Sequence, residues 1–219
     1  MQILRRRTLV LLFGLLAGAF AHVPEGIAQS ADLGPPPQGE LQGRALLAAL
    51  RGGGYILYFR HTSTDFGQND EQMTGYENCA TQRNLTDQGR AEARAIGVEL
   101  RELAIPIGEV LASPFCRTME TARLMFGRAT ATPAVRGGPA QPESADRYKE
   151  LRKLLSVPVP AATNLVIASH GNPFRAVVGG PYLAEGEAVV IAPRGKDGFS
   201  VVAHVRKDAW EDLAAPRPP

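Results

Sequence analysis

The 219-residue sequence predicts an α/β fold, a three-layer α/β/α sandwich with a mostly parallel central sheet and a C-terminal hairpin. Three observations predict it. Short apolar runs alternate along the chain with segments of helical periodicity. Residues 165–168 are apolar throughout, as in strands of a sheet that is covered on both faces. Two strand-like runs near the end, 187–192 and 199–205, are separated by a turn that contains Pro and Gly.

Each of the other expected elements has a local signal of its own. Aromatic and β-branched residues over 55–59 and an apolar triplet over 110–112 indicate two further strands. Helices are expected where apolar residues recur at three- and four-residue intervals. They are expected over 41–50 before three glycines, from the capping residue Thr86 to the residue before Pro106, over 115–126 before Gly127, over 148–155 and over 173–178.

The N-terminus has the pattern of a secretory signal peptide over residues 1–21. Three arginines at positions 5–7 precede the uncharged apolar run 9–20, which is shorter than the roughly 20 residues that a bilayer span needs. Cleavage could follow position 21 or come as late as position 30, and an uncleaved anchor is the alternative. We therefore expect a periplasmic or secreted protein with a linker over 22–39, one domain over 40–212 and a disordered tail over 213–219.

The charge balance excludes one class of partner. The chain has 24 basic and 22 acidic residues, and loss of the leader removes three arginines. The mature domain is therefore close to neutral, and no basic stripe argues for nucleic-acid binding. We expect contact with a membrane only through the export signal, and the sequence leaves the oligomeric state open.

The sequence contains two cysteines, Cys79 and Cys116. Two cysteines make neither a disulfide scaffold nor a zinc-finger pattern. In an oxidising compartment they could form a disulfide bond, and two buried free thiols are the other possibility. The sequence leaves both open, but Cys116 directly precedes Arg117, so the region around it bears on the chemistry described next.

Polar side chains follow three of the expected strands at the point where each strand ends. These segments are Arg60-His61-Thr62, Ser113-Pro114 leading into Arg117, and Ser169-His170-Gly171-Asn172. In open α/β sheets, ligands bind in the crevice outside the carboxyl ends of the strands. We therefore expect two histidines and two arginines to converge on one ligand.

This set of residues suits a phosphoryl group. Guanidinium groups bind two phosphate oxygens at once and stay charged at any working pH. A neutral imidazole can attack phosphorus when its other ring nitrogen is held as a donor, and His61, directly after a strand, is well placed for this. His170, protonated near a bound dianion, would stabilise negative charge on the equatorial oxygens.

On these residues the sequence resembles the histidine phosphatase superfamily, the phosphoglycerate-mutase-like proteins, over residues 55–210. The matching motifs are Arg60-His61 with Thr64 downstream, Leu85-Thr86-Asp87-Gln88-Gly89 before a helix, Ser113-Pro114 with Arg117 and Thr121-Ala122, and Ser169-His170-Gly171-Asn172. Asn78-Cys79 and Gln82-Arg83 are similar to a bacterial subgroup, some of whose members resemble lipopolysaccharide core heptose phosphatases.

The resemblance implies a fold and a set of roles. The fold would be phosphoglycerate-mutase-like, with His61 as the phosphorylated nucleophile. The phosphate pocket would be formed by Arg60, Arg117 and His170. The residues that line it would be Thr64, Asn172 and Thr62, which stands where the family usually has glycine.

The resemblance also implies a carboxylic acid that protonates the leaving oxygen. Its position along the chain points to Glu143, although the Glu-rich pattern usual around such an acid is absent. Asp65 and Glu185 are the alternatives. A site without a dedicated acid, as in the small phosphohistidine phosphatases, is also compatible with the sequence.

The predicted function is exported, metal-independent hydrolysis of a small-molecule or glycan phosphomonoester, through a phosphohistidine on His61. A phosphohistidine phosphatase and a non-catalytic phospho-ligand binding module of the same fold are the alternatives. No cofactor is expected, and no metal, because short ligand spacings such as His-x-x-x-His do not occur. The unpatterned segments 65–83 and 128–144 are expected to set the specificity for the substrate.

Overall fold

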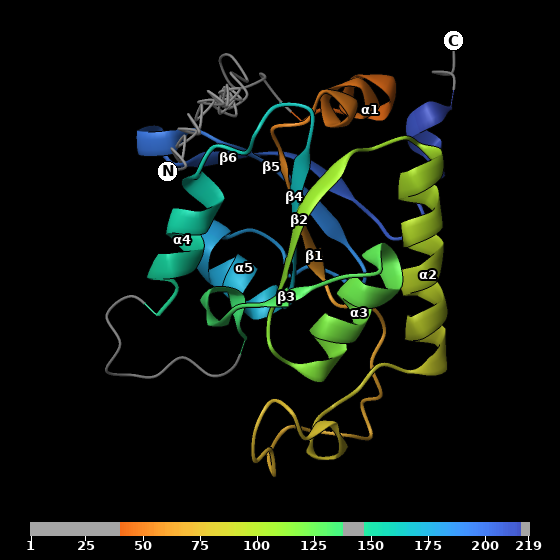
Figure 1. Ribbon diagram of the computed structural model, residues 1–219, viewed down its shortest axis with the longest axis vertical. Helices are drawn as coiled ribbons and strands as arrows, with labels where there is room; N and C mark the ends of the chain where they lie inside the picture. The colour runs from red at the N-terminus through yellow and green to blue at the C-terminus, as the bar shows by residue number, and fades with distance from the viewer. Residues whose placement is uncertain (1–39, 138–146, 216–219) are drawn as a thin grey trace, which may run out of the picture.

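A computed structural model describes residues 40–137 and 147–215 of the chain, in which helices cover both faces of one six-stranded sheet (Figure 1). The expected leader, the linker over 22–39 and Glu143 lie outside the described residues. The strands are β1 Ile56–Arg60, β2 Ile107–Ala112, β3 Thr130–Ala131, β4 Asn164–Ser169, β5 Ala188–Pro193 and β6 Phe199–Val205. The α-helices are α1 Gly43–Gly52, α2 Asp87–Glu102, α3 Cys116–Phe126, α4 Lys149–Ser156 and α5 Gly171–Val178.

The sheet is mostly parallel, with an antiparallel hairpin at one edge. Its strand order is β3-β2-β4-β1-β5-β6. The four strands β1 to β4 run parallel, whereas β5 pairs antiparallel with β1, and β6 pairs antiparallel with β5. The α/β fold predicted from the sequence, including its C-terminal hairpin, is therefore confirmed.

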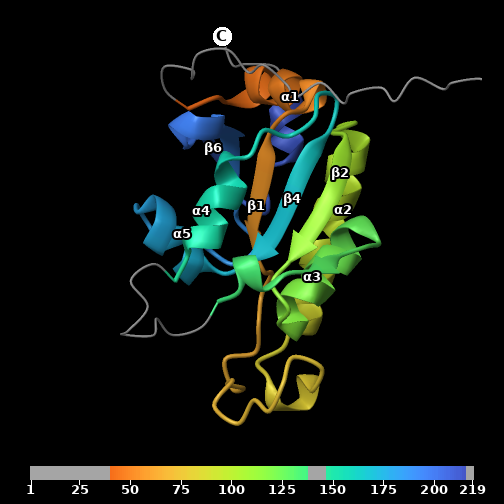
Figure 2. The same cartoon turned by 60° about the vertical axis from the view of Figure 1, so that its left-hand side comes forward.

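An apolar core on each face of the sheet holds the three layers together. Helices α1, α2 and α3 lie over one face, and α4 and α5 lie over the other (Figure 2). In β1, Leu57 and Phe59 join the first core, whereas Ile56 and Tyr58 join the second. A strand buried on both faces has to be apolar at successive positions, which explains this run in the sequence. No helix in the described part of the chain is both long enough and apolar enough to cross a membrane.

The register of the central strands aligns their carboxyl ends. Arg60 at the end of β1 pairs with Ser169 at the end of β4, and Ala112 at the end of β2 pairs with Ala168. The residues that follow these strands therefore emerge at one edge of the sheet. The loop of residues 61–86 extends beyond the same edge (Figure 1).

Helix α2 begins where the sequence predicts and packs closely against the chain that leaves β1. The hydroxyl of Thr86 caps the helix by accepting a hydrogen bond of 3.0 Å from the N–H of Gly89. A Cβ atom on Gly89 would lie only 2.0 Å from the carbonyl oxygen of Ser63. Any larger residue would push the helix away, which explains the glycine at the end of the Leu85 motif.

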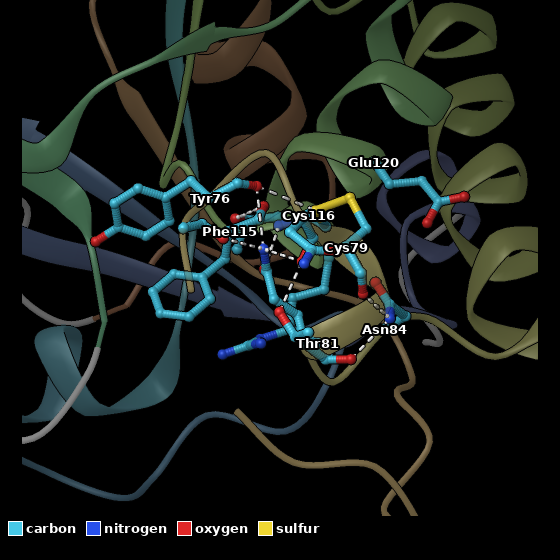
Figure 3. The surroundings of a disulfide bond; sticks show 12 residues. Tyr76, Cys79, Thr81, Asn84, Phe115, Cys116 and Glu120 are labelled. Carbon is cyan, nitrogen blue, oxygen red and sulfur yellow. Dashed lines mark hydrogen bonds between the residues drawn. A yellow bond between two sulfur atoms is a disulfide. The ribbon is translucent and has the colours of Figure 1, made fainter. Parts of the chain in front are cut away.

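A disulfide bond joins the long loop to the first residue of α3 (Figure 3). The Cα atoms of Cys79 and Cys116 are 5.7 Å apart, so the pairing that the sequence left open is present. The buried side chain of Gln82 reinforces this connection. Its amide oxygen accepts from the N–H of Cys116, and its amide nitrogen donates to the carbonyls of Gly75 and Tyr76. The loop and the start of α3 are therefore held together as one unit.

Two boundaries differ from the expected ones. Helix α5 begins at Gly171 rather than at Pro173, because a proline is tolerated in the first turn, where backbone N–H groups have no partner within the helix. The expected disordered tail from position 213 is corrected as well. A 3₁₀ helix spans Glu211–Ala214, and Leu213 is only 6% exposed because it is part of the core that includes α1. The domain therefore extends at least to this helix.

We expect reduction of the disulfide to destabilise the domain. The bond closes a segment with a sequence separation of 37, so the chain-entropy effect alone corresponds to about 3–4 kcal/mol in the free energy of unfolding. Thermal unfolding with and without a reductant measures this, and the variant with Cys79→Ser and Cys116→Ser serves as the control that a reductant should not affect. Equal melting temperatures of the wild type under both conditions would contradict the expectation.

Candidate active site

The two predicted histidines lie together at the carboxyl edge of the sheet. His61 follows β1 and His170 follows β4, and these strands are neighbours in the parallel part of the sheet. The centroids of the two rings are 5.5 Å apart, and the rings are inclined at 72°. Both side chains are buried, with exposed fractions of 1% and 4%. At this separation both imidazoles can contact a single phosphoryl group.

His61 is held by its backbone and by one of its ring nitrogens. Its N–H donates to the carbonyl of Ser169, and its carbonyl accepts from the N–H of Gly186, both at 3.0 Å. Nδ1 lies 3.0 Å from the carbonyl oxygen of Thr62, which can only accept, so Nδ1 carries the proton. Nε2 then has the lone pair and can act as a nucleophile.

His170 is fixed by groups from three different elements. Its carbonyl accepts a hydrogen bond of 2.8 Å from the hydroxyl of Tyr58 in β1. Its Nε2 lies 2.8 Å from Oγ of Ser113, the residue that follows β2. The ring of Phe115 packs edge-to-face against the imidazole at a centroid distance of 5.0 Å. Through Ser113, the Ser113-Pro114 motif is connected to the histidine pair.

A single carboxylate, that of Glu185, connects Arg60 to the nucleophile. Nη1 of Arg60 donates to the carbonyl of Leu183 at 2.7 Å, and Nη2 lies 3.4 Å from Oε1 of Glu185. The same carboxylate accepts from the hydroxyl and the N–H of Thr64, at 2.6 Å and 3.2 Å. Its Oε1 is also 3.8 Å from Nδ1 of His61. Glu185 therefore orients Arg60 and lies on the Nδ1 side of the His61 ring.

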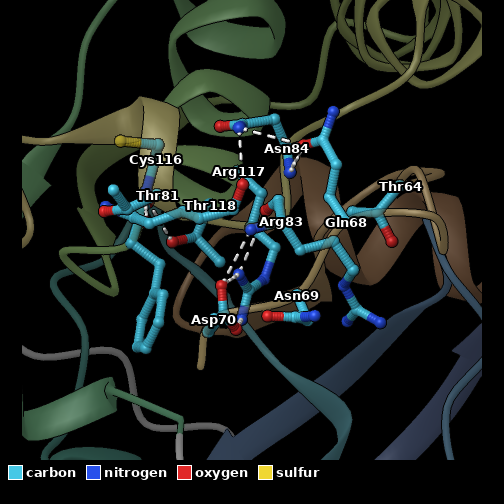
Figure 4. Close-up of polar contacts among 12 residues, drawn as sticks. Thr64, Gln68, Asn69, Asp70, Thr81, Arg83, Asn84, Cys116, Arg117 and Thr118 are labelled. Carbon is cyan, nitrogen blue, oxygen red and sulfur yellow. Dashed lines mark hydrogen bonds and ion pairs between the residues drawn. The ribbon is translucent and has the colours of Figure 1, made fainter. Parts of the chain in front are cut away.

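Arg117, the second predicted phosphate ligand, makes a two-pronged ion pair with a residue of the long loop (Figure 4). Its Nη1 and Nη2 each lie 3.0 Å from one carboxylate oxygen of Asp70. Nη1 also donates to the carbonyl of Arg83 at 3.1 Å, while Oδ1 of Asp70 accepts from the N–H of Arg83 at 2.9 Å. Both arms of the Arg117 guanidinium fork are thus taken by Asp70 of the loop.

Two charged residues of the site, Asp70 and Arg83, were not assigned to it by the sequence analysis. The positive charge of Arg83 lowers the pKa of both histidines, so its guanidinium lies close to them. The guanidinium lies 4.9 Å from the centroid of the Phe66 ring and forms no ion pair with any described residue. The signal that could have found it is its place in the Gln82-Arg83 motif shortly after Cys79.

Burial and nearby positive charge keep both histidines neutral. Burial lowers the pKa of His61 well below 6.5, and three guanidinium groups lower it further. The pKa of His170 is also lowered well below 6.5, first by burial and then by His61 and the same guanidinium groups. These groups belong to Arg117, Arg60 and Arg83. A bound phosphate dianion would oppose their charge and so favour protonation of His170.

The other predicted pocket residues differ in where their side chains lie. Thr62 is fully buried and its hydroxyl lies 3.3 Å from that of Thr121 in α3, so its side chain packs inward. The expected role of this side chain in lining the pocket is corrected, because the carbonyl of Thr62 is the group that serves the site. The hydroxyl of Thr64 binds Glu185, and Asn172 lies in the first turn of α5.

The three carboxylates considered for the leaving-group acid are placed very differently. Glu143 lies outside the described residues. Asp65 turns back into its own loop, where it accepts from the N–H of Gly67 and from the side chain of Gln68. Glu185 lies inside the site, as described above. Among residues 40–137 and 147–215, no group of three or more His, Cys, Asp or Glu side chains is arranged to hold a metal ion.

A wide cavity of about 970 Å³ opens beside the disulfide bond rather than at the histidine pair. Tyr76, Cys116 and Glu120 are among the residues that line it, and neither histidine is. Figure 3 shows Tyr76 and Glu120 in the surroundings of the disulfide. The cavity is therefore separate from the candidate active site.

The chain is similar to known proteins in part of its sequence and in its fold. The chain matches the family model of the histidine phosphatase superfamily, branch 1, over residues 56–138. Among solved structures, the protein histidine phosphatase SixA complexed with tungstate is similar with a TM-score of 0.50 at 15% identity, over 70% of this chain and 97% of that chain. A phosphoserine phosphatase variant from Entamoeba histolytica, in complex with phosphoserine, has a TM-score of 0.49 at 10% identity, over 70% and 98% of the two chains. No curated protein sequence matches the chain.

These findings establish the fold of the chain. The chain has the histidine phosphatase fold, and its resemblance to the histidine phosphatase superfamily is confirmed. The family model that matches is that of branch 1, and its segment contains Arg60, His61 and Arg117. His170 lies outside that segment, and it is the parallel pairing of β4 with β1 that brings it to the other three residues.

We expect the folded protein to lose stability as the pH is lowered from about 6.5 to about 5. The pKa values of His61 and His170 in the folded state are below the unfolded value, so the unfolded chain binds more protons in this range. Each group can contribute up to about 1.4 kcal/mol per pH unit. Thermal unfolding across this range measures the slope, which should be flatter for His170→Asn, and an unchanged slope in that variant would count against the neutral histidine pair.

Proposed function

We propose that this protein is a metal-independent phosphatase that hydrolyses a phosphomonoester through a phosphohistidine intermediate on His61. The observation that carries the proposal is the fixed imidazole of His61. Its Nδ1 donates to the carbonyl of Thr62, and Nε2 is left for attack next to His170 and the guanidinium groups. The family-model match over residues 56–138, which include His61 and Arg117, supports this chemistry.

The reaction proceeds in two steps at one position. In the first step Nε2 of His61 attacks phosphorus in line, so that a P–N bond forms while the P–O bond to the leaving group breaks. Arg60 and Arg117 bind the equatorial oxygens, and His170, protonated next to the phosphate charge, donates to one of them. In the second step water attacks phosphorus, the P–N bond breaks, and neutral His61 is regenerated.

We infer that the protein is exported and acts in the periplasm or outside the cell. The arginines at positions 5–7 and the apolar run 9–20 form the export signal. The disulfide between Cys79 and Cys116 supports this location, because disulfides persist in oxidising compartments and are rare in the cytosol. An exported enzyme would not meet the cytosolic substrate of a glycolytic mutase, so hydrolysis is favoured over mutase activity.

The proposed substrate is a small-molecule or glycan phosphomonoester of the cell envelope. Two aromatic rings next to the arginines of the site are exposed, Phe66 at 72% and Tyr182 at 47%. The guanidinium of Arg83 lies over the first ring at 4.9 Å, and that of Arg60 lies over the second at 5.1 Å. Exposed rings next to phosphate ligands offer apolar faces to the organic part of an ester.

The test compares the wild type with His61→Ala on p-nitrophenyl phosphate in the presence of a chelator. We expect the wild type to release phosphate and the variant to lose about 10³-fold or more of kcat, because the nucleophile is gone. An alkaline quench should trap acid-labile phosphohistidine on the wild type and none on the variant. His204→Ala, the same substitution at an exposed position of β6, is the matched control and should behave like the wild type.

Each of the other outcomes would indicate a different function or a different nucleophile for this protein. Equal background release by the wild type and His61→Ala, with retained phosphate binding, would favour a non-catalytic phospho-ligand binding module. Label on an acid-stable residue would rule out His61 as the nucleophile. Turnover of phosphohistidine peptides without turnover of phosphomonoesters would indicate a phosphohistidine phosphatase.

A further inference from the structure

One role in the reaction is not filled by the matching motifs, that of the acid that protonates the leaving oxygen. An alcohol is a poor leaving group unless it receives a proton as the P–O bond breaks. In-line attack places the leaving oxygen across phosphorus from Nε2 of His61. His61 and Arg60 lie where β1 ends at the carboxyl edge of the sheet, so an acid on the far side of phosphorus would belong to a segment that extends beyond that edge.

Glu185 lies on the wrong side of the nucleophile for this role. Its Oε1 is 3.8 Å from Nδ1 of His61, the ring nitrogen that faces away from the attack. Its oxygens are also used by the N–H and hydroxyl of Thr64 and by Arg60. A carboxylate held in this way orients the nucleophile and a phosphate ligand. Glu185 is therefore a positioning residue.

Asp70 approaches the site from outside. It belongs to the loop of residues 61–86, which extends beyond the carboxyl edge of the sheet (Figure 2). Its carboxylate forms an ion pair with Arg117 (Figure 4). The side chain of Asp70 is 33% exposed, whereas that of Arg117 is 6% exposed, so Asp70 occupies the outer position of the pair. An incoming leaving group would meet this carboxylate first.

Phosphate and Asp70 compete for the same guanidinium fork. Asp70 uses both Nη1 and Nη2 of Arg117, which are the donors that a phosphoryl group would take. A phosphate dianion that took these donors would leave the carboxylate of Asp70 beside it, because the Cys79–Cys116 bond keeps the loop close to α3.

Building on the function proposed above, we propose that Asp70 is the general acid and base of this phosphatase. The proton that Asp70 takes up comes from the phosphomonoester, whose second pKa is about 6, or from water. As the P–N bond to His61 forms and the P–O bond breaks, Asp70 gives this proton to the leaving oxygen. In the second step its carboxylate takes a proton from the attacking water as the O–P bond forms and the P–N bond breaks. Asp70 then passes this proton to the departing phosphate or to solvent and returns to Arg117 as the carboxylate.

The test uses Asp70→Asn, which keeps the size of the side chain and removes the acid, on two substrates with different leaving groups. Glycerol phosphate releases an alcohol that needs a proton, so we expect kcat to fall by about 10²–10³-fold. p-Nitrophenyl phosphate releases an acidic phenol that can leave without one, so we expect a loss of less than about tenfold.

Two further variants separate acid catalysis from simpler effects. Glu71→Gln removes one negative charge from the neighbouring exposed position of the same loop and should behave like the wild type on both substrates. Glu185→Gln should slow both substrates by similar factors, because its carboxylate orients groups that both reactions need. Circular dichroism and melting temperatures establish that each variant is folded.

The other outcomes overturn the proposal in distinguishable ways. An equal loss on both substrates would make Asp70 a residue that positions Arg117. Faster turnover of both substrates, with tighter binding of inorganic phosphate, would make it a competitor of the substrate and nothing more. In both cases phosphohistidine would still form on His61, and the proposed function would stand. A wild type that forms no phosphohistidine would overturn the proposed function and the role of Asp70 together.

Discussion

The site depends on the parallel pairing of β1 with β4. The N–H of His61 donates to the carbonyl of Ser169, which continues the ladder of the two strands one residue beyond the end of β1. Neighbouring strands lie about 4.8 Å apart, and the imidazoles that follow them have centroids 5.5 Å apart. The distance between the imidazoles of His61 and His170 is therefore set mainly by the backbone of the sheet.

The same three positive charges surround the candidate phosphate pocket and lower the pKa of His61. Three guanidinium groups around two buried histidines would be costly if all were unpaired, and Asp70 and Glu185 offset two of them in the free protein. These charges and burial lower the pKa of His61, so that its imidazole is neutral and nucleophilic. A phosphate then brings the negative charge that the site lacks. Binding the substrate and readying the nucleophile therefore rest on one electrostatic arrangement.

Much of this could be predicted from the sequence, because apolar runs followed at once by His61, Ser113 and His170 fix both the strands and the edge at which they end. The role of Thr62 could not be predicted in the same way. A sequence does not tell whether a residue serves a site by its side chain or by its carbonyl, and here it is the carbonyl that binds Nδ1 of His61. Leu213 was missed because a 3₁₀ helix of four residues has too few positions to show a period.

The contacts of Asp70 and Arg83 in the site could not be predicted for a different reason, although both residues lie in the segment 65–83 that the sequence assigns to specificity. They lie in an aperiodic loop, and Asp70 meets Arg117 across 47 positions of the sequence. Their placement depends on two long-range restraints, the Cys79–Cys116 bond and the hydrogen bond from the N–H of Cys116 to Gln82, and neither has a periodic signature.

The loop that the Cys79–Cys116 disulfide holds carries two charged residues of the candidate site. The loop supplies a carboxylate that pairs with Arg117 and a guanidinium that lowers the pKa of both histidines, within 14 residues between positions 70 and 83. A substitution that reshapes the loop for a new ester would therefore also shift the charge around His61. The Cys79–Cys116 bond therefore ties the segment that carries both charged residues to the start of α3.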